Sequence, residues 1–143
     1  ALEVYIMTAY SISTYYIYIN LNLRIMKEIE AIIRKTKFED VRNALLEAGI
    51  EWFSYYDVRG EGKMRQTHIY RGIVYDTSSI ERVLLNIVVR EKNVERTIEA
   101  IRKASWTGEI GDGRIFIIPV DDTVRIRTGE RGDIALYNAE NEK

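Results

Sequence analysis

Apolar positions recur along the chain with two periods, which predict its strands and helices. Alternating apolar and polar residues, or short apolar runs, predict strands over residues 27–34, 50–58, 83–89 and 114–119. Apolar residues at helical spacing predict a helix that starts with a capping box of Thr36 and Glu39 and ends at Gly49. A second helix is predicted to follow Asn93 as its N-cap and to end before Gly108.

The order of these elements predicts the fold class. A β-α-β-loop-β-α-β order is the ferredoxin-like βαββαβ pattern, an α+β fold with one antiparallel sheet and two helices on one face. The opposite face needs cover, and the strands that contain Ile29, Ile87 and Ile117 could present apolar groups on both faces. We therefore expect the chain to self-associate through this sheet.

The connection between the second and third strands is unusually long. Residues 60–79 are mostly polar and show no clear period. A structureless loop of about 20 residues is uncommon in a compact domain and is usually functional where it occurs. After the last strand, a short extended piece is expected over residues 125–127.

The two ends of the chain differ from this body. No charged residue occurs from Val4 to Leu23, but Ser, Thr, Asn and Tyr interrupt the stretch, so we do not expect a membrane-spanning helix. Residues 16–23 alternate Tyr or Asn with Ile or Leu, which predicts a strand. The segment could also be translated sequence upstream of a start at Met26. We expect an aromatic β-rich extension, a single domain and a flexible tail, over residues 1–25, 26–136 and 137–143.

Composition narrows the possible chemistry. The chain has 143 residues, enough for one domain with its own core. It has no cysteine and a single histidine, His68, which excludes disulfides, a thiolate nucleophile, a cysteine zinc site and a histidine cluster. Lys and Arg total 21 and Asp and Glu total 22, for a formal net charge of -1, so an extended nucleic-acid surface is not expected.

Two glycine-centred turns are the best candidates for a binding site, because bare backbone N–H groups beside a cation can hold an anion. They are residues 60–63 (Gly-Glu-Gly-Lys) and 111–114 (Gly-Asp-Gly-Arg), and neither is a Walker A loop or a Gly-x-Gly-x-x-Gly motif. In an extended segment, Arg125 and Arg127 would point to one side, where one ligand could meet both. Together these features predict a polyphosphate ligand, although each turn alone could be a simple loop.

Other residues allow other interpretations. Asp112 or His68 could be the base of a ferredoxin-like enzyme that acts on a phosphorylated small molecule, but no convincing acid/base pair is evident. Asp121 and Asp122 could hold a cation or form a solvated turn. The aromatic residues over 52–56 could stack RNA bases, or could pack in the core or a subunit interface.

Several segments resemble the PII nitrogen-regulatory signal proteins, and the resemblance covers residues 26–136. The most specific is the fourteen-residue segment from Thr107, which is similar to the family's C-terminal signature without a break. The similar segments are MKEIEAIIR (26–34), VRGEG (58–62), YRGIVY (70–75), TGEIGDGRIFIIPV (107–120) and RIRTGE (125–130).

The resemblance implies a regulator, not an enzyme: a homotrimer of ferredoxin-like subunits with ATP or ADP bound in clefts between them. One subunit would supply the glycine turns, and its neighbour would supply Ser54, Arg125 and Arg127. The implied nucleotide-binding residues are Ser54, Gly60, Gly62, Lys63, Val88, Gly111, Asp112, Gly113, Arg114, Arg125 and Arg127.

The resemblance also implies that residues 59–82 form the family's T-loop, a loop that docks onto target proteins. The implied target is an ammonium transporter, glutamine synthetase or a nitrogenase-type enzyme, and the implied location is the cytoplasm. Neither a nucleic-acid partner nor insertion into a membrane is expected.

Three positions in or next to this loop bear on its ligands. Met64 stands where the family has a Gln that helps to hold Mg²⁺ and 2-oxoglutarate, and a thioether is a poor ligand for a hard cation, so we expect little response to 2-oxoglutarate. Arg82 replaces the lysine that meets the 2-oxoglutarate carboxylate and could still pair with it. Tyr75 aligns with a tyrosine that some bacterial relatives uridylylate, but Ile73 and Val74 replace the small and acidic residues that usually precede it.

Overall fold

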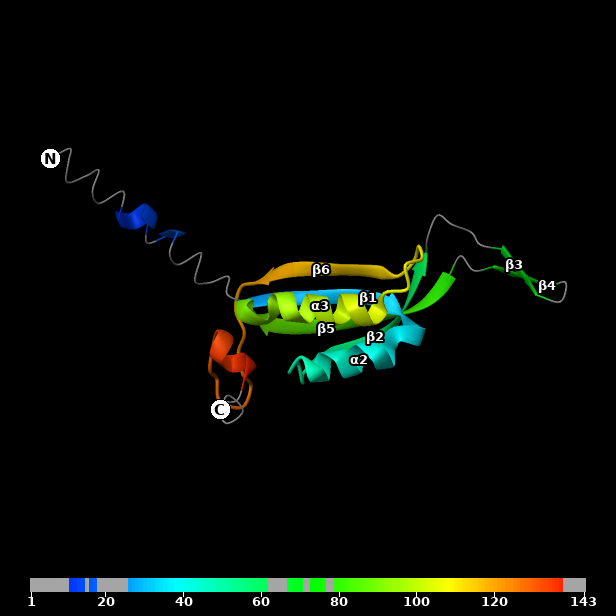
Figure 1. The fold of residues 1–143 in the computed structure, drawn as a ribbon. Helices are drawn as coiled ribbons and strands as arrows, with labels where there is room; N and C mark the ends of the chain where they lie inside the picture. Colours follow the sequence, from blue (N-terminus) through cyan, green and yellow to red (C-terminus); the bar gives the residue numbers. More distant parts are fainter. Residues whose placement is uncertain are drawn as a thin grey trace.

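The computed structural model describes residues 11–14, 16–17, 26–61, 67–70, 73–76 and 79–137. It contains a four-stranded sheet with two helices packed on it and a separate two-stranded sheet (Figure 1). The strands are β1 (Met26–Arg34), β2 (Ser54–Glu61), β3 (Thr67–Tyr70), β4 (Ile73–Asp76), β5 (Ser79–Arg90) and β6 (Gly113–Val120). The helices are α2 (Phe38–Glu47) and α3 (Val94–Ser105), with 3-10 turns η1 (Lys35–Lys37), η2 (Glu91–Asn93) and η3 (Asp133–Leu136).

All pairings in the larger sheet are antiparallel, and the strand order is β2-β5-β1-β6. Ile29 of β1 lies opposite Ile87 of β5 on one side and Ile117 of β6 on the other. This arrangement confirms the predicted ferredoxin-like fold, in which the first and third strands of the βαββαβ pattern lie at the centre of the sheet.

One face of the central strands forms the core with the two helices. Ile29, Ala31 and Ile33 alternate along β1 and are at most 2% exposed, as the period of a strand with one buried face requires. Val41 and Leu45, one turn apart on α2, belong to the same buried cluster. Burying a side chain of this size contributes about 1.5–3 kcal/mol, so this face holds the helices on the sheet.

The other face carries apolar side chains that the chain itself leaves partly uncovered. Phe116 and Ile118 of β6 are 43% and 38% exposed, and Tyr56 of β2 is 53% exposed. The register puts these residues on the same face as Leu84 and Ile32. Exposed apolar side chains gathered on one face of a sheet are typical of an interaction site, and self-association through this face stays a prediction.

The connection between β2 and β5 contains more regular structure than was predicted from the absence of a regular apolar pattern in its sequence. β2 continues to Glu61 and β5 begins at Ser79. Between them β3 pairs with β4, with Tyr70 opposite Ile73. Both strands contain β-branched and aromatic residues, which favour strands without strict alternation. The prediction of an aperiodic loop over residues 60–79 was therefore wrong in part.

Two predicted extended segments also differ from the structure. Residues 11–14 and 16–17 are helical, and the rest of the extension lies outside the described residues. A helix satisfies its backbone hydrogen bonds internally, whereas a strand needs a partner. No helix among the described ranges is long and apolar enough to cross a membrane. Residues 125–127 lead into a turn, in which the Arg125 N–H donates to the Glu130 carbonyl at 2.9 Å.

The helix starts follow a different pattern from the predicted caps. α2 has Lys37 as N-cap, and neither this residue nor Asn93, the N-cap of α3, makes a side-chain capping hydrogen bond. Each helix is instead preceded by a 3-10 turn, whose first carbonyl accepts a hydrogen bond from the N–H of Phe38 or Val94. The 3-10 turn thus supplies a hydrogen-bond acceptor for a backbone N–H group at the helix start, a group that a capping side chain would otherwise satisfy.

Gly113 at the start of β6 is expected to be essential to the sheet. Its φ is +108°, and a Cβ there would lie 1.8 Å from the carbonyl oxygen of Ile32. Substituting Gly113→Ala should lower the free energy of unfolding by more than about 3 kcal/mol, because backbone must move. Gly129→Ala is the matched control, since Gly129 has φ +73° and nothing within 4 Å of the added atom. Gly129→Ala should lower the free energy of unfolding by only about 1–2 kcal/mol, through backbone strain alone.

Urea denaturation of the two variants measures both effects. Equal losses of stability in the two variants would contradict the steric argument at Gly113.

Candidate functional site

The turn from α3 into β6 is organised by the carboxylate of Asp112. This group accepts hydrogen bonds from the backbone N–H of Thr107 at 2.8 Å, from the N–H of Gly108 at 3.0 Å and from the Thr107 hydroxyl. Arg34, at the end of β1, donates from Nε to the same carboxylate at 3.1 Å and from Nη2 to the Ile110 carbonyl at 3.1 Å. Asp112 therefore fixes the shape of the turn and ties it to β1.

The same donors determine the protonation of Asp112. The Thr107 hydroxyl and N–H, with smaller contributions from Arg34 and the Gly108 N–H, hold the pKa of this carboxyl far below its usual range. A carboxylate that accepts this many hydrogen bonds is a poor proton acceptor at neutral pH. The geometry thus disfavours Asp112 as the base of an enzyme and gives it the role of shaping the turn.

Gly111 of this turn lies beside two guanidinium groups. The Cβ that it lacks would be 3.1 Å from Nη2 of Arg82 and 3.4 Å from Nη2 of Arg34. Arg82 is only 8% exposed, and burial, followed by the charge of Arg34, lowers the pKa of its guanidinium. In the immediate surroundings of Gly111, the guanidinium groups of Arg34 and Arg82 outnumber the Asp112 carboxylate, and positive charge attracts anions.

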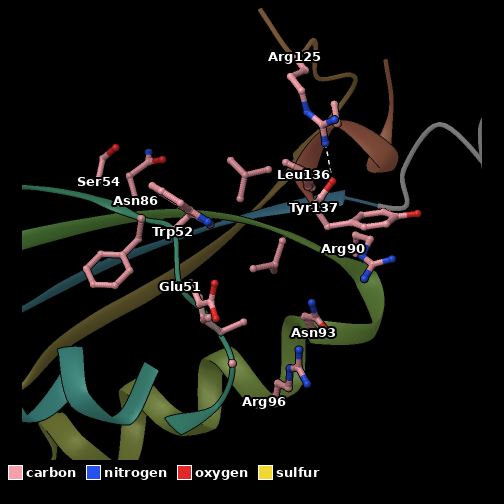
Figure 2. A pocket seen from close by; sticks show the side chains of 16 residues that line it. Glu51, Trp52, Ser54, Asn86, Arg90, Asn93, Arg96, Arg125, Leu136 and Tyr137 are labelled. Carbon is pink, nitrogen blue, oxygen red and sulfur yellow. Dashed lines mark hydrogen bonds between the residues drawn. The ribbon is translucent and has the colours of Figure 1, made fainter. Parts of the chain in front are cut away.

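A cavity of about 760 Å³ lies at the other end of the sheet, between the start of β2, the end of β5 and the C-terminal segment (Figure 2). Ser54 and Asn86, opposite each other in the β2–β5 pairing, both line it. The amide nitrogen of Asn86 donates to the Glu28 carboxylate, which orients the Asn86 side chain. Predicted site residues in the lining are Ser54, Val88 and Arg125. Lining residues that sequence analysis did not assign to this site include Trp52, Asn86, Arg90, Arg96 and Tyr137.

Arg125 holds the C-terminal segment at the edge of this cavity. Its Nη2 donates to the Ile134 carbonyl at 2.9 Å and to the Tyr137 carbonyl at 2.5 Å, and its Nη1 donates to the Glu130 carboxylate at 2.5 Å. Arg127 lies two residues further along in the turn and is exposed. The expectation that both arginines point to one side of an extended strand is therefore wrong, because the chain turns between them.

The predicted site residues fall into two groups at opposite ends of the sheet. Gly113 lies opposite Ile33 of β1, whereas Val88 lies opposite Glu28. Five residues of strand separate those two positions, which is roughly 16 Å. One chain therefore does not bring the glycine turn and the cavity together.

The remaining predicted residues are placed only in part. Gly60 lies in β2 opposite Ile80, and Arg114 follows Gly113 in β6 and is exposed. The backbone of Tyr75 lies in β4, opposite His68. Gly62, Lys63 and Met64 lie outside the described residues.

The alternative chemistries find little support in the part of the chain that the structure describes. There, no three His, Cys, Asp or Glu side chains group to hold a metal ion. Asp122 instead closes a turn: it pairs with Arg131 at 2.6 Å and accepts hydrogen bonds from the N–H groups of Thr123 and Gly132. Arg131 and these donors lower the pKa of Asp122, in agreement with the solvated-turn interpretation.

The depressed pKa of Asp112 predicts part of the pH dependence of folding. Because the folded-state pKa lies below the ordinary value of 3.8, the stabilisation is present above pH 3.8 and is lost as the pH falls below it. Asp112→Asn should lower the midpoint of thermal unfolding at pH 7 and should weaken the further decrease between pH 5 and pH 2.5, scanned by circular dichroism. Asp57→Asn is the control, because Asp57 is an exposed carboxylate paired with Lys35. A pH profile of Asp112→Asn parallel to that of wild type would contradict this role.

Comparison with known proteins gives one consistent family. The family model described as Nitrogen regulatory protein P-II matches residues 26–130. A Nitrogen regulatory protein P-II from Azospirillum brasilense is 45% identical over 112 residues, which cover 78% of this chain and 100% of the relative. The protein of the same name from Synechocystis sp. is 46% identical over the same shares of both chains.

A solved structure agrees with these relatives. The crystal structure of Arabidopsis thaliana PII bound to citrate is similar with a TM-score of 0.64 and 39% identity, over 77% of this chain and 91% of that one. The relatives are regulatory proteins, which confirms the prediction of a regulator over that of an enzyme. The fold and the sequence thus agree that this chain belongs to the nitrogen regulatory protein P-II family.

Proposed function

We propose that the chain is a cytoplasmic regulator of nitrogen metabolism that binds ATP or ADP between the subunits of a homotrimer. The observation that carries this proposal is the division of the predicted ligand residues between two ends of one sheet, near Gly113 and near Val88. If the glycine turn of one subunit faces the cavity of its neighbour, the two groups form one site.

The glycine turn suits the phosphates of a nucleotide. Gly111 has a φ of 101°, so the backbone of the turn can approach a ligand where another residue would place a side chain. Arg34 and Arg82 add positive charge beside Gly111. The citrate in the Arabidopsis thaliana relative is likewise an anion with several carboxylates.

The cavity suits a base and a ribose. Its volume of about 760 Å³ lies within the range of about 300–1,000 Å³ that is typical of small-molecule sites. Val88 and Trp52 offer apolar surface, and Ser54 offers a hydroxyl. A carboxylate only accepts hydrogen bonds, so the amide nitrogen of Asn86 faces Glu28, and its carbonyl oxygen is the atom that could accept from the amino group of adenine.

Trimer formation would cover the apolar face of the sheet. Tyr56, Phe116 and Ile118 lose contact with water if three sheets pack around a common axis. The family supports a trimer, and the open face gives this chain a physical reason to form one.

The loop over residues 59–82 would carry the signal to a target protein. Its paired strands β3 and β4 stand apart from the four-stranded sheet in Figure 1. ATP and ADP would make different contacts at the cleft and so favour different loop conformations. The target would be an ammonium transporter, glutamine synthetase or a nitrogenase-type enzyme.

Nucleotide binding can be tested by calorimetry with ATP and with ADP. We expect about one site per subunit, little turnover, and a particle of three 16.7 kDa chains in sedimentation. Arg127→Ala should weaken binding by about 1–3 kcal/mol if Arg127 makes a charged hydrogen bond to the phosphates. Arg42→Ala is the control, since Arg42 pairs with Glu39 on an exposed face of α2.

Three results would contradict this proposal. They are a monomer in sedimentation, no heat with either nucleotide, and steady hydrolysis of ATP. The last would favour the alternative of an enzyme acting on phosphorylated small molecules.

Met64 is expected to limit the response to 2-oxoglutarate. With Mg²⁺ and ATP present, titration of 2-oxoglutarate into the wild type should give little additional heat, because a thioether binds Mg²⁺ poorly. Met64→Gln supplies an amide oxygen and should create a Mg²⁺-dependent response, which calorimetry with and without Mg²⁺ would detect. A strong Mg²⁺-dependent response of the wild type would show that Met64 does not have this effect.

A further inference from the structure

The side chain of Asn86 connects a carboxylate of the sheet with the cavity. Asn86 lies in β5, and its amide nitrogen donates to the carboxylate of Glu28 in the neighbouring strand β1. On the other side of β5, Asn86 lies opposite Ser54, the first residue of β2. Asn86 and Ser54 both line the cavity, as Figure 2 shows, whereas Glu28 is not among the lining residues. Glu28 can therefore influence a ligand in the cavity through Asn86.

The cavity lies along the part of β5 that β2 leaves unpaired. The pairing of β2 with β5 ends where Ser54 meets Asn86, so residues 87–90 of β5 have no partner in the described part of β2. β5 stays paired with β1 along these same residues. Residues of this unpaired edge that line the cavity are Val88, Val89 and Arg90. A ligand in the cavity thus approaches Asn86 from the side of β2, away from Glu28.

The carboxylate of Glu28 fixes which way round the Asn86 amide lies. An ionised carboxylate accepts hydrogen bonds and donates none, so it holds the NH2 group of Asn86. The carbonyl oxygen of the same amide is then turned away from β1. The reversed amide would place this oxygen against the carboxylate, which is electrostatically unfavourable. The hydroxyl of Ser54 can rotate to donate or to accept, so it imposes no direction of its own.

The surroundings of Glu28 on this face of the sheet leave the task of pairing with its carboxylate to Asn86. A second carboxylate, that of Glu30, lies two residues along β1 and directly opposite Asn86. On the described strands, none of the residues opposite these two glutamates carries a positive charge. These residues are Val88, Ile118, Asn86 and Phe116. This part of β1 therefore presents only acceptors to Asn86, which favours the same orientation of the amide.

We infer that Glu28 is a positioning residue that sets, through Asn86, which base the cavity accepts. The carbonyl oxygen of Asn86 accepts a hydrogen bond from a 6-amino group, as in adenine, and repels a 6-oxo group, as in hypoxanthine or guanine. The inference rests on the proposed nucleotide site and adds the origin of its selectivity. A site that pairs its polar group with one ligand and leaves it unpaired with another discriminates well between the two.

Calorimetry with ADP and with IDP tests this selection, because IDP carries a 6-oxo group where ADP carries the 6-amino group. Wild type should bind ADP roughly tenfold or more tightly than IDP. Glu28→Gln should lower this ratio by at least about threefold, because an amide both donates and accepts and no longer fixes Asn86. Glu28→Lys supplies only donors, so it should hold the carbonyl oxygen of Asn86 and shift the preference toward IDP.

The matched control is Glu30→Gln. It removes the same charge from the same face of β1, opposite Asn86, but keeps the hydrogen bond from Asn86 to Glu28. This variant should keep the wild-type ratio of the two affinities. Each ratio compares two ligands on one protein, so general damage to the fold weakens both and does not change it. Thermal unfolding and sedimentation of each variant check that fold and assembly are retained.

The outcomes separate this inference from the proposed function. If wild type binds ADP and IDP equally well, nucleotide binding stands and selection by Asn86 is wrong. If Glu28→Gln and Glu28→Lys both keep the wild-type ratio, Glu28 does not position Asn86. An equal loss of selectivity in Glu30→Gln would assign the effect to the charge of the face and would overturn the role of the hydrogen bond. If wild type binds neither nucleotide, the proposed function is wrong, and this inference fails with it.

Discussion

The glycine turn, which is the half of the proposed binding site next to the end of β1, depends on one carboxylate. Asp112 gathers two backbone N–H groups, a hydroxyl and the guanidinium of Arg34, and so fixes the turn before any ligand arrives. Arg34 and Arg82 could not lie together beside Gly111 at low cost without a nearby negative charge, because like charges repel strongly where water is scarce. The carboxylate therefore makes possible both the shape of the turn and its positive charge, and each is needed to hold an anion.

Strand β5 connects the two halves of the proposed site. Arg82, near its start, lies beside the glycine turn, and Val88, near its end, lines the cavity. The same strand begins at Ser79, where the long loop ends. A ligand shared by two subunits would thus touch one β5 near the loop and another β5 at the cavity. This arrangement would let ligand contacts reach the loop along a rigid element and across the subunit interface, without a large movement inside either subunit.

The sequence predicted the fold well because each core strand and helix buries one face, and burial leaves its period in the sequence. It failed over β3 and β4, whose sequences do not alternate strictly between apolar and polar residues, and at the turn after Arg125, which depends on hydrogen bonds between residues several positions apart. The glycine turns were visible because their residue types are unusual. Asn86 became a site residue only through the register that puts it opposite Ser54, and Tyr137 only through its contact with Arg90. Neither relation leaves a signal in local sequence.

The two halves of the site also differ in how they are held. The glycine turn is fixed by hydrogen bonds within residues 107–112 and to Arg34, all inside the region that the family model matches. The cavity is lined on one side by the C-terminal segment, which is attached through Arg125 and Tyr137. The hydrogen bonds to Asp112 give the turn its shape without a ligand, whereas this side of the cavity depends on a segment that a few side-chain contacts hold in place.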